Sequence, residues 1–311
     1  MNEPITFSGH ANKWYHAALM RIHKDGAAVT ARGRATRELL HVTTHLSNPR
    51  NRVLTVPHRR WNPFWAASEL VWILAGSRDA AWITGYNSRL RQYLDEPEAS
   101  TFHGAYGYRL RHAGRDQLRD VIRQLQEDPG SRRAVATLHD PVLDNPDVIT
   151  KDRPCNCALA YHLRDGVLWA ATFNRSNDFI LGLTGTNLVQ FTTIQEFLAA
   201  ALGADVGGYS HFSASLHLYE DDAIAARLLS RIDDDYAFDV YDAVRPCPMR
   251  PWAYPREGWA TITKLYNGMP LDVDTCPYWR SIGIMLAAWA LLKQNNLRDA
   301  MTAMATMEAE D

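Results

Sequence analysis

Cysteine is scarce in this sequence, with four residues in a chain of 311, at Cys155, Cys157, Cys247 and Cys276. Four cysteines are too few for a disulfide framework in a chain of this length, so at least one is better interpreted as a reduced, reactive thiol. Long apolar runs are absent as well. No stretch of about 18 apolar residues could span a bilayer, and the N-terminus lacks the apolar segment of a signal peptide. We therefore expect a cytoplasmic protein with no membrane partner.

The sequence also lacks an excess of basic charge. Its 33 Lys and Arg residues stand against 35 Asp and Glu residues, which gives a net charge of -2. A general nucleic-acid binder would present a strongly basic face, so no nucleic-acid partner is expected, and any anionic ligand must be held by a local group of arginines. No linker or low-complexity run divides the chain. With 46% hydrophobic residues it can bury a full core, and we expect one domain over 1–311.

Hydrophobic periodicity predicts the main elements. Helices are expected over 11–23, 61–76, 115–127, 187–202 and 223–232, strands over 134–139, 157–163, 167–173 and 210–219, and a last helix or pair of helices over 282–307. The strands 157–163 and 167–173 should form a hairpin. Helix 187–202 should be capped by Asn187 or Thr186 at its start and by Gly203 at its end. Residues 77–112 are predicted to be mostly irregular, and 235–280 show weak periodicity.

Glu69 is the one charge in the apolar helix 61–76. Burying a carboxylate costs several kcal/mol unless something compensates. Glu69 therefore lies either on a solvent-facing stripe or in the interior as an acid/base group with a raised pKa, and periodicity does not decide between the two.

Two arginine-containing segments could meet an anion. Arg32 and Arg34 flank Gly33 in a turn that could place backbone N–H groups and a guanidinium around a phosphate, although a surface loop would need no such role. Arg132 and Arg133 precede the strand 134–139. Because adjacent strand residues point to opposite faces, one chain would not obviously aim both at one ligand.

The segment 153–219 concentrates groups that could act on a phosphorylated heterocycle, namely a thiol, a fixed cation, an amide and hydroxyl donors. Its anchors are Pro154-Cys155, Asn174-Arg175-Ser176-x-Asp178, Leu181-Gly182, Asn187, His211 and His217-x-Tyr219. Upstream lie Ser68-Glu69-Leu70, Tyr106-Gly107 and Ser131-Arg132-Arg133. In order and spacing this set resembles the signature of the thymidylate synthase superfamily over about residues 30–225, and residues 235–311 have no clear counterpart.

The resemblance implies an α+β, three-layer fold in which a large mixed β-sheet is covered by helices and one sheet face forms a homodimer. It implies a pyrimidine nucleoside monophosphate as substrate, 5,10-methylenetetrahydrofolate as cofactor, and no metal. Cys155 would add to C6 of the pyrimidine as a thiolate, because C5 is a poor nucleophile until C6 is attacked. Arg175 would lower the pKa of this thiol. Cys157 is the rival on the same strand face, but only Cys155 carries the preceding Pro.

The remaining roles follow from the same resemblance. Glu69 becomes the acid/base near the pyrimidine and Tyr106 assists proton removal from C5. Phosphate would be bound by Arg175, Ser176, Arg32 in preference to Arg34, and Arg132 and Arg133 reaching across from the partner subunit. Asn187 would bind the base, His217 and Tyr219 the sugar, and Asp178 the pterin ring of the folate.

Departures from the synthase pattern bear on the last step, in which a C5 methylene intermediate takes hydride to give methyl or water to give hydroxymethyl. The usual His after Cys155 is Asn156, the segment 85–93 carries no Trp, and the chain ends in an acidic stretch, 304–311. Hydride transfer needs water excluded. Without a tryptophan in the pocket wall and without a C-terminal tail that closes the pocket, we expect water to be the final reactant. The chain therefore resembles the pyrimidine nucleotide 5-hydroxymethylases. These include phage dCMP enzymes and the CMP hydroxymethylase of mildiomycin-type antibiotic pathways.

The sequence does not decide which pyrimidine base the substrate carries, because the Asn187 amide pairs with uracil in one orientation and with cytosine when flipped. With cytosine a full proton for N3 must come from water or from an acid such as Glu69. The hydroxymethylase features favour cytidylate, CMP or dCMP. Deoxyuridylate hydroxymethylation and thymidylate synthesis are the alternatives. A nucleotide-binding regulator without catalysis is a further one and predicts an unreactive Cys155.

Overall fold

A mixed β-sheet organises the computed structural model, which describes residues 5–231, 241, 246, 248–249, 255–272 and 274–307. Its strands are β1 (Ile5–Ser8), β2 (Ala27–Ala31), β3 (Arg34–Leu46), β4 (Val135–Thr137), β5 (Asn156–Arg164), β6 (Val167–Asn174), β7 (Asn177–Asp178) and β8 (Asp205–Tyr219). The main path runs β1-β3-β8-β6-β5-β4. The pairs β3·β8 and β5·β6 are antiparallel, whereas β1·β3 and β6·β8 are parallel. The predicted α+β class with a large mixed sheet is thus confirmed.

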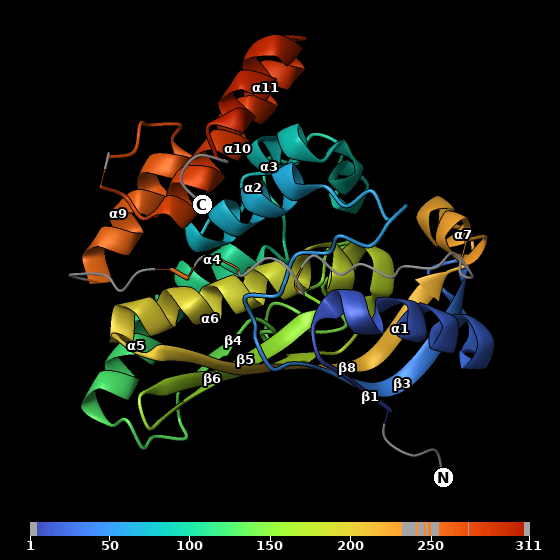
Figure 1. The fold of residues 1–311 in the computed structure, drawn as a ribbon. Coiled ribbons are helices and arrows are strands. Elements are labelled where there is room, and N and C mark those ends of the chain that lie inside the picture. Colours follow the sequence, from blue (N-terminus) through green and yellow to red (C-terminus); the bar gives the residue numbers. More distant parts are fainter. Residues whose placement is uncertain are drawn as a thin grey trace.

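Helices cover one face of this sheet in two further layers (Figure 1). Helices α1 (Ala11–Asp25) and α6 (Leu188–Leu202) lie directly on the sheet, and α2 (Pro63–Leu74) packs on α6 beneath α10 (Pro277–Lys293). The other helical segments are α3 (Ala80–Tyr86), η1 (Ser88–Tyr93), α4 (Tyr106–Arg111), α5 (Gln117–Glu127), η2 (Phe179–Asn187), α7 (Ala223–Leu229), α9 (Pro255–Tyr266) and α11 (Leu297–Ala305). Within the described ranges none of these helices has the length and apolarity that a bilayer crossing requires.

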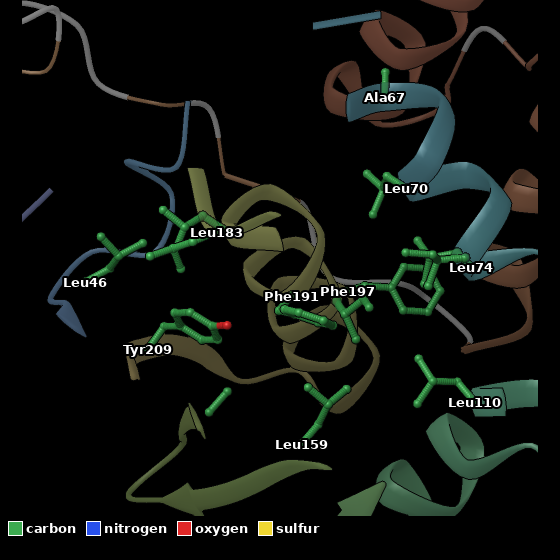
Figure 2. Packing of buried hydrophobic residues seen from close by; sticks show 14 of the residues in the cluster. Leu46, Ala67, Leu70, Leu74, Leu110, Leu159, Leu183, Phe191, Phe197 and Tyr209 are labelled. Carbon is green, nitrogen blue, oxygen red and sulfur yellow. The ribbon is translucent and has the colours of Figure 1, made fainter. Parts of the chain in front are cut away.

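The core lies between the sheet and α2, with α6 at its centre (Figure 2). Helix α6 is buried on nearly all sides, as expected of a helix without a polar face. Phe191 and Phe197 from α6 pack among Leu70 of α2 and Tyr209 of β8. Burying each such large apolar side chain contributes about 1.5–3 kcal/mol. This packing fixes α2 above the sheet, and α2 carries Glu69.

Helix α6 also contains a buried charge, Glu196, which would be unfavourable without partners. Arg50 Nε lies 2.6 Å from one of its oxygens, and the Arg52 guanidinium binds the other. The backbone N–H of Met249 donates to Glu196 at 2.9 Å. The pKa of Glu196 is lowered despite its burial, because the Arg52 charge and these hydrogen bonds stabilise the carboxylate.

The opposite face of the sheet carries exposed apolar side chains. Leu40 is 59% exposed, Trp169 46% and Phe173 42%. The ring of Phe173 stacks on Phe212 with centroids 5.2 Å apart. In Figure 1 no described helix lies against this face. Exposed apolar side chains on one face of a sheet often mark an interaction surface.

Most strongly periodic elements occur where the sequence predicts them. Gly203 ends α6 in the left-handed conformation, with φ 63, and the C-terminal pair of helices is confirmed as α10 and α11. Two predictions are wrong. Residues 77–112 contain α3, η1 and α4. Helix α6 is not capped by Asn187 or Thr186, because it continues from the π-helical segment η2, which Asp178 caps. Cys247 and the tail 308–311 lie outside the described residues.

Candidate active site

One pocket of about 370 Å³ brings together most of the side chains singled out from the sequence. Its walls come from α2, α4, η1, η2, the β2–β3 hairpin, β8 and the loop before β5. The predicted site residues that line it are Arg32, Glu69, Tyr106, Cys155, Arg175, Ser176, Asp178, Asn187, His217 and Tyr219. Arg132 and Arg133 do not line it and are exposed before β4. Their role in a partner's site stays a prediction.

Cys155 stands immediately before β5, and Arg175 holds it from the end of β6. The backbone N–H of Arg175 donates to Cys155 O at 2.9 Å, and its Nε donates to Pro154 O at 3.0 Å. These bonds place Arg175 Nη2 3.9 Å from Cys155 Sγ. Cys157 does not line the pocket, because the β5–β6 register shifts between Asn156 and Ala158. Of the two cysteines weighed from the sequence, Cys155 is therefore the one that lines the pocket.

The environment of the thiol differs from the prediction in one respect. Burial raises the pKa of Cys155, and the positive charges of Arg175 and Arg32 only partly oppose this rise. Arg175 thus lowers the pKa of the thiol, as predicted, but the burial that outweighs this effect was not predicted. The pKa depends on how deeply the sulfur lies in the pocket, which the sequence does not reveal.

Glu69 faces the pocket and not bulk solvent. Helix α2 begins with Pro63 after Asn62, whose side chain accepts from Trp65 N, so the helix start is fixed. Burial raises the pKa of Glu69 from 4.5 to about 7, against hydrogen bonds with Thr186 and Gln190. Its Oε2 is buried without a partner among the described residues. Of the two alternatives left open by periodicity, the structure shows the second, a Glu69 in the interior with a raised pKa.

Tyr106 lies beside the thiol at the start of α4. Its Oη accepts a hydrogen bond from Asn156 N at 3.2 Å, and burial, together with the neighbouring Cys155, raises its pKa well above the usual value. The next residue must be small, because a Cβ on Gly107 would lie 2.5 Å from Ile73 O. Helix α4 therefore packs directly on α2, and this contact sets the distance between Tyr106 and Glu69.

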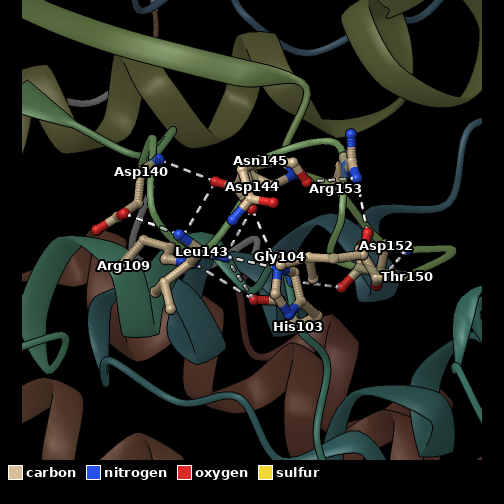
Figure 3. A network of polar contacts seen from close by, with 12 residues as sticks. His103, Gly104, Arg109, Asp140, Leu143, Asp144, Asn145, Thr150, Asp152 and Arg153 are labelled. Atoms are coloured by element: carbon tan, nitrogen blue, oxygen red, sulfur yellow. Dashed lines mark hydrogen bonds and ion pairs between the residues drawn. The ribbon is translucent and has the colours of Figure 1, made fainter.

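A network of ion pairs ties α4 to the loop that leads to Cys155 (Figure 3). Arg109 donates to both carboxylate oxygens of Asp144, at 3.1 and 2.9 Å, and His103 Nε2 lies 3.1 Å from the same carboxylate. Gly104 N donates to Asp152 Oδ2 at 2.8 Å. A Cβ on Gly104 would lie 2.4 Å from Asp152 O, so only glycine permits this approach. The network is buried between the elements that carry Tyr106 and Cys155.

The arginine side of the pocket is formed by the β2–β3 hairpin. Arg32 and Gly33 both adopt positive φ, 52 and 74, at the hairpin turn, and Arg32 lines the pocket. Arg34 is paired with Asp221 and lies over the Tyr219 ring, 3.7 Å from its centroid. Of the two arginines weighed from the sequence, Arg32 is therefore the one that lines the pocket, and its Nη1 donates to Lys151 O at 3.3 Å.

His217 and Asn187 line the deeper part of the pocket. Burial lowers the pKa of His217 to about 4, although the charge of Glu38 opposes the change, so the imidazole is neutral at physiological pH. Asn187 Nδ2 donates to Asn177 Oδ1 at 3.2 Å. The amide thus has one fixed neighbour and retains both a donor and an acceptor for a base. Asn177 itself is the residue left unspecified in the motif, and sequence reasoning missed it.

Asp178 has a structural bond as well as a place in the pocket. Its Oδ1 accepts from Ile180 N and Leu181 N at 2.8 and 2.9 Å, and burial raises its pKa to about 6. An apolar wall lies in the same pocket, formed by Trp65, Trp72, Ile73, Ile83, Leu90, Tyr93, Phe102 and Leu181.

The prediction of a wall without indole was wrong. Segment 85–93 supplies Leu90 and Tyr93, but Trp65 and Trp72 line the pocket from α2. They stand four residues before and three after Glu69, a helical spacing that could have identified them. The described end of the chain, α11, contributes nothing to the lining. Among the described residues no group of three or more His, Cys, Asp or Glu could hold a metal ion.

Comparison with known proteins agrees with this geometry. The family model for thymidylate synthase matches residues 13–236. A deoxyuridylate hydroxymethyltransferase of Bacillus phage SP01 is 39% identical over 247 residues, which cover 76% of this chain and 64% of the relative. One of the same description from Pseudomonas phage M6 is 38% identical over 182 residues, 58% of this chain and 51% of the relative. A putative thymidylate synthase of Methanosarcina acetivorans is 33% identical over 150 residues, 46% of this chain and 66% of the relative. The chain thus spans less than two thirds of the phage relatives.

Proposed function

Since this chain belongs to the thymidylate synthase family, we propose that it is a one-carbon transferase that hydroxymethylates C5 of a pyrimidine nucleoside monophosphate. The observation that carries the proposal is the position of Cys155. Its Sγ lies 3.9 Å from Arg175 Nη2, in a pocket that also contains Glu69 and Asn187. A nucleophile, a fixed cation, a proton-exchanging acid and a base-pairing amide are the groups that this reaction requires.

The chain's own residues account for activation of the ring. Cys155 Sγ adds to C6 of the pyrimidine as a thiolate, which moves electron density to C5 and the O4 edge. Arg175 attracts the thiolate form and, with Arg32 and Ser176, binds the nucleotide phosphate. Asn187 and Glu69 stabilise the electron-rich ring edge by hydrogen bonding and proton exchange. After C5 has gained its substituent, loss of the C5 proton, assisted by Tyr106, and departure of the thiolate restore the aromatic ring.

The pocket fits 5,10-methylenetetrahydrofolate, which supplies a one-carbon unit at the oxidation level of formaldehyde. Asp178 would hold the polar edge of its pterin ring, and the apolar wall containing Trp72, Ile73 and Leu181 would hold its aromatic surface. With water as the final reactant, C5–H is replaced by C5–CH2OH and no net oxidation or reduction occurs.

Water as the final reactant is supported by the phage relatives, whose names describe hydroxymethyl transfer. Asn156 at the position of the usual His is a further departure from the synthase pattern. Trp65 and Trp72 place indole rings in the pocket wall, so water as the final reactant is proposed from the phage relatives and from Asn156.

Deoxyuridylate is the substrate that we propose first. The phage relatives are named for it, and the neutral Asn187 amide satisfies the O4 and N3–H groups of uracil without proton transfer. Cytidylate, which the departures in the sequence favoured, remains the second candidate. Glu69 supports it, since a carboxyl with a pKa of about 7 is partly protonated at neutral pH and could supply the proton that cytosine N3 needs.

A homodimer through the exposed sheet face completes the proposal. Leu40, Trp169 and Phe173 would be buried against a second copy. Arg132 and Arg133 would then reach the phosphate in the partner's pocket.

Mixing Cys155→Ser with Arg132→Ala/Arg133→Ala subunits tests this arrangement, because the mixed dimer has one pocket with all its residues. We expect about a quarter of wild-type activity after random reassembly. Absence of recovery, with mixed dimers demonstrated, would refute shared pockets.

The direct test of function is covalent trapping. Incubation with 5-fluoro-dUMP and 5,10-methylenetetrahydrofolate should give an adduct on Cys155, detected by peptide mass spectrometry, and Cys155→Ser should give none. An unmodified wild-type enzyme would favour a regulator that does not catalyse. Mass spectrometry of products from dUMP, dCMP and CMP should show addition of CH2O. Formation of dTMP with dihydrofolate would instead identify a thymidylate synthase.

A further inference from the structure

A chain of four buried side chains runs from the pocket into the sheet. Asn187 Nδ2 donates to Asn177 Oδ1 at 3.2 Å, and Asn177 Nδ2 donates to His211 Nε2 at 2.8 Å. His211 Nδ1 is 2.8 Å from Tyr209 Oη, which also has a hydrogen bond with the Thr172 side chain. We call Tyr209, His211, Asn177 and Asn187 the relay. Only Asn177 and Asn187 line the pocket.

The relay is buried and uncharged. Tyr209 and Asn177 are 1% exposed and His211 is 0% exposed. Burial lowers the pKa of His211 to about 3, so the ring is neutral and carries one proton, on either Nδ1 or Nε2. Burial likewise keeps Tyr209 protonated by raising its pKa. Every hydrogen bond in such a chain has a direction, and each one constrains the next.

The contacts in the structure select one direction. Because Asn177 turns its NH2 group toward His211, Nε2 must accept and the ring proton must lie on Nδ1, where it is donated to Tyr209 Oη. Asn177 Oδ1 then accepts from Asn187, which fixes the orientation of that amide. In the reverse direction Tyr209 donates to Nδ1, Nε2–H donates to Asn177, and both amides are flipped. Reversal therefore exchanges the positions of the carbonyl and the NH2 group that Asn187 presents to the base.

We propose that the direction of this relay, and not Asn187 alone, determines whether the pocket prefers uracil or cytosine. Uracil presents an acceptor at O4 and a donor at N3, whereas cytosine presents a donor at N4 and an acceptor at N3. One amide orientation pairs with the first edge and the flipped amide with the second. His211 and Tyr209 are positioning residues in this scheme, since they act through Asn177 and touch no substrate. The inference rests on the proposed function and specifies its base selectivity.

Gly182 of the Leu181-Gly182 motif gains a role from the same geometry. A Cβ at this position would lie 2.6 Å from Asn177 Oδ1 and 3.7 Å from Asn187 Nδ2. Its φ is not positive, so space and not backbone conformation requires glycine here. The glycine allows Asn177 to occupy the middle of the relay.

The test is Tyr209→Phe, which removes one buried oxygen at the far end of the relay and keeps the ring. With that anchor lost, the two directions become closer in free energy, and we expect the ratio of kcat/KM for the preferred base over the other to fall about tenfold. Thr44→Val is the matched control. Thr44 pairs with His211 across β3 and β8, and its buried hydroxyl has no partner among the described residues. Its removal should leave the ratio unchanged.

A merely structural role for Tyr209 would lower both kcat/KM values by the same factor, and a constant ratio would overturn the proposal. Equilibrium binding of dUMP, dCMP and CMP to the same variants separates this failure from failure of the proposed function, because base preference in binding requires no turnover. If Tyr209→Phe does not fold, the tautomer of His211 in the wild-type enzyme still tests the proposal. 15N NMR of His211 should show protonated Nδ1 with the preferred nucleotide and protonated Nε2 with the other. The same tautomer in both complexes would refute the relay.

Discussion

Replacement of Glu69 by glutamine should make the protein more stable while it abolishes efficient turnover. Burial raises the pKa of Glu69 from 4.5 to about 7, so the folded protein binds this proton more tightly than the unfolded chain does. The stability contributed by Glu69 is therefore complete below pH 4.5 and is lost as the pH rises toward 7. By this linkage, the raised pKa of Glu69 lowers the unfolding free energy by about 3 kcal/mol at pH 8 and by about 1 kcal/mol at pH 5, relative to low pH. Glutamine has nearly the same shape and never ionises.

We expect Glu69→Gln to raise the unfolding free energy at pH 8 by up to about 3 kcal/mol, or Tm by roughly 5 °C, with a much smaller gain at pH 5. Urea and thermal unfolding of both proteins at the two pH values measure this. The exposed Glu127, at the end of α5, provides the control Glu127→Gln, which should show no such pH-dependent gain. Equal stability of wild type and Glu69→Gln at pH 8 would show that Glu69 is not held in a desolvated site, and its assignment as an acid near neutral pH would fail.

Three other predictions follow from the structure. Glu196→Ala leaves Arg52 buried without its carboxylate and should lower the free energy of unfolding, measured in urea, by about 3–5 kcal/mol. Replacing both Glu196 and Arg52 by uncharged residues should lower it less. Gly107→Ala places a methyl group 2.5 Å from Ile73 O, so both Tm and kcat should fall; an unchanged kcat would mean that the α2–α4 contact does not position Tyr106. Arg32→Ala should raise the nucleotide KM at least tenfold, whereas Arg34→Ala should change it less than threefold, and the reverse order in steady-state kinetics would exchange their roles.

The sequence predicts the fold wherever one side-chain pattern persists over several turns. In helix α5 the apolar side chains recur at helical spacing on one face and the charged ones lie on the other. Its predicted start and end lie within two residues of those observed. Helices α3 and α4 span only seven and six residues, too short for periodicity to be read. Local contacts form them instead, as when the Asp79 side chain accepts from Ala81 N and Trp82 N. The segment that the sequence predicted to be irregular is thus a set of short helices, of which α3 and η1 are capped by Asp79 and Asn87.

The site was predictable where a residue's chemistry identifies it and less so where burial decides. Cys155, Arg175 and Asn187 were identified by type and spacing, and the structure brings them together. The effect of Arg175 on the Cys155 pKa was predicted, but the larger effect of burial was not, because charge can be read from the sequence and the depth of a pocket cannot. Tyr209 was missed since a tyrosine in a buried strand is usually core, and nothing in the sequence indicates its bond to a histidine.

The Arg109–Asp144 and Gly104–Asp152 contacts have a consequence for motion. They join α4, which begins at Tyr106, to the loop that leads to Cys155. Thermal fluctuations should therefore displace the Tyr106 phenol and the Cys155 thiol together, so that their alignment is preserved. The substitution Asp144→Asn weakens these contacts. It should slow the chemical step in single-turnover experiments more than it weakens nucleotide binding.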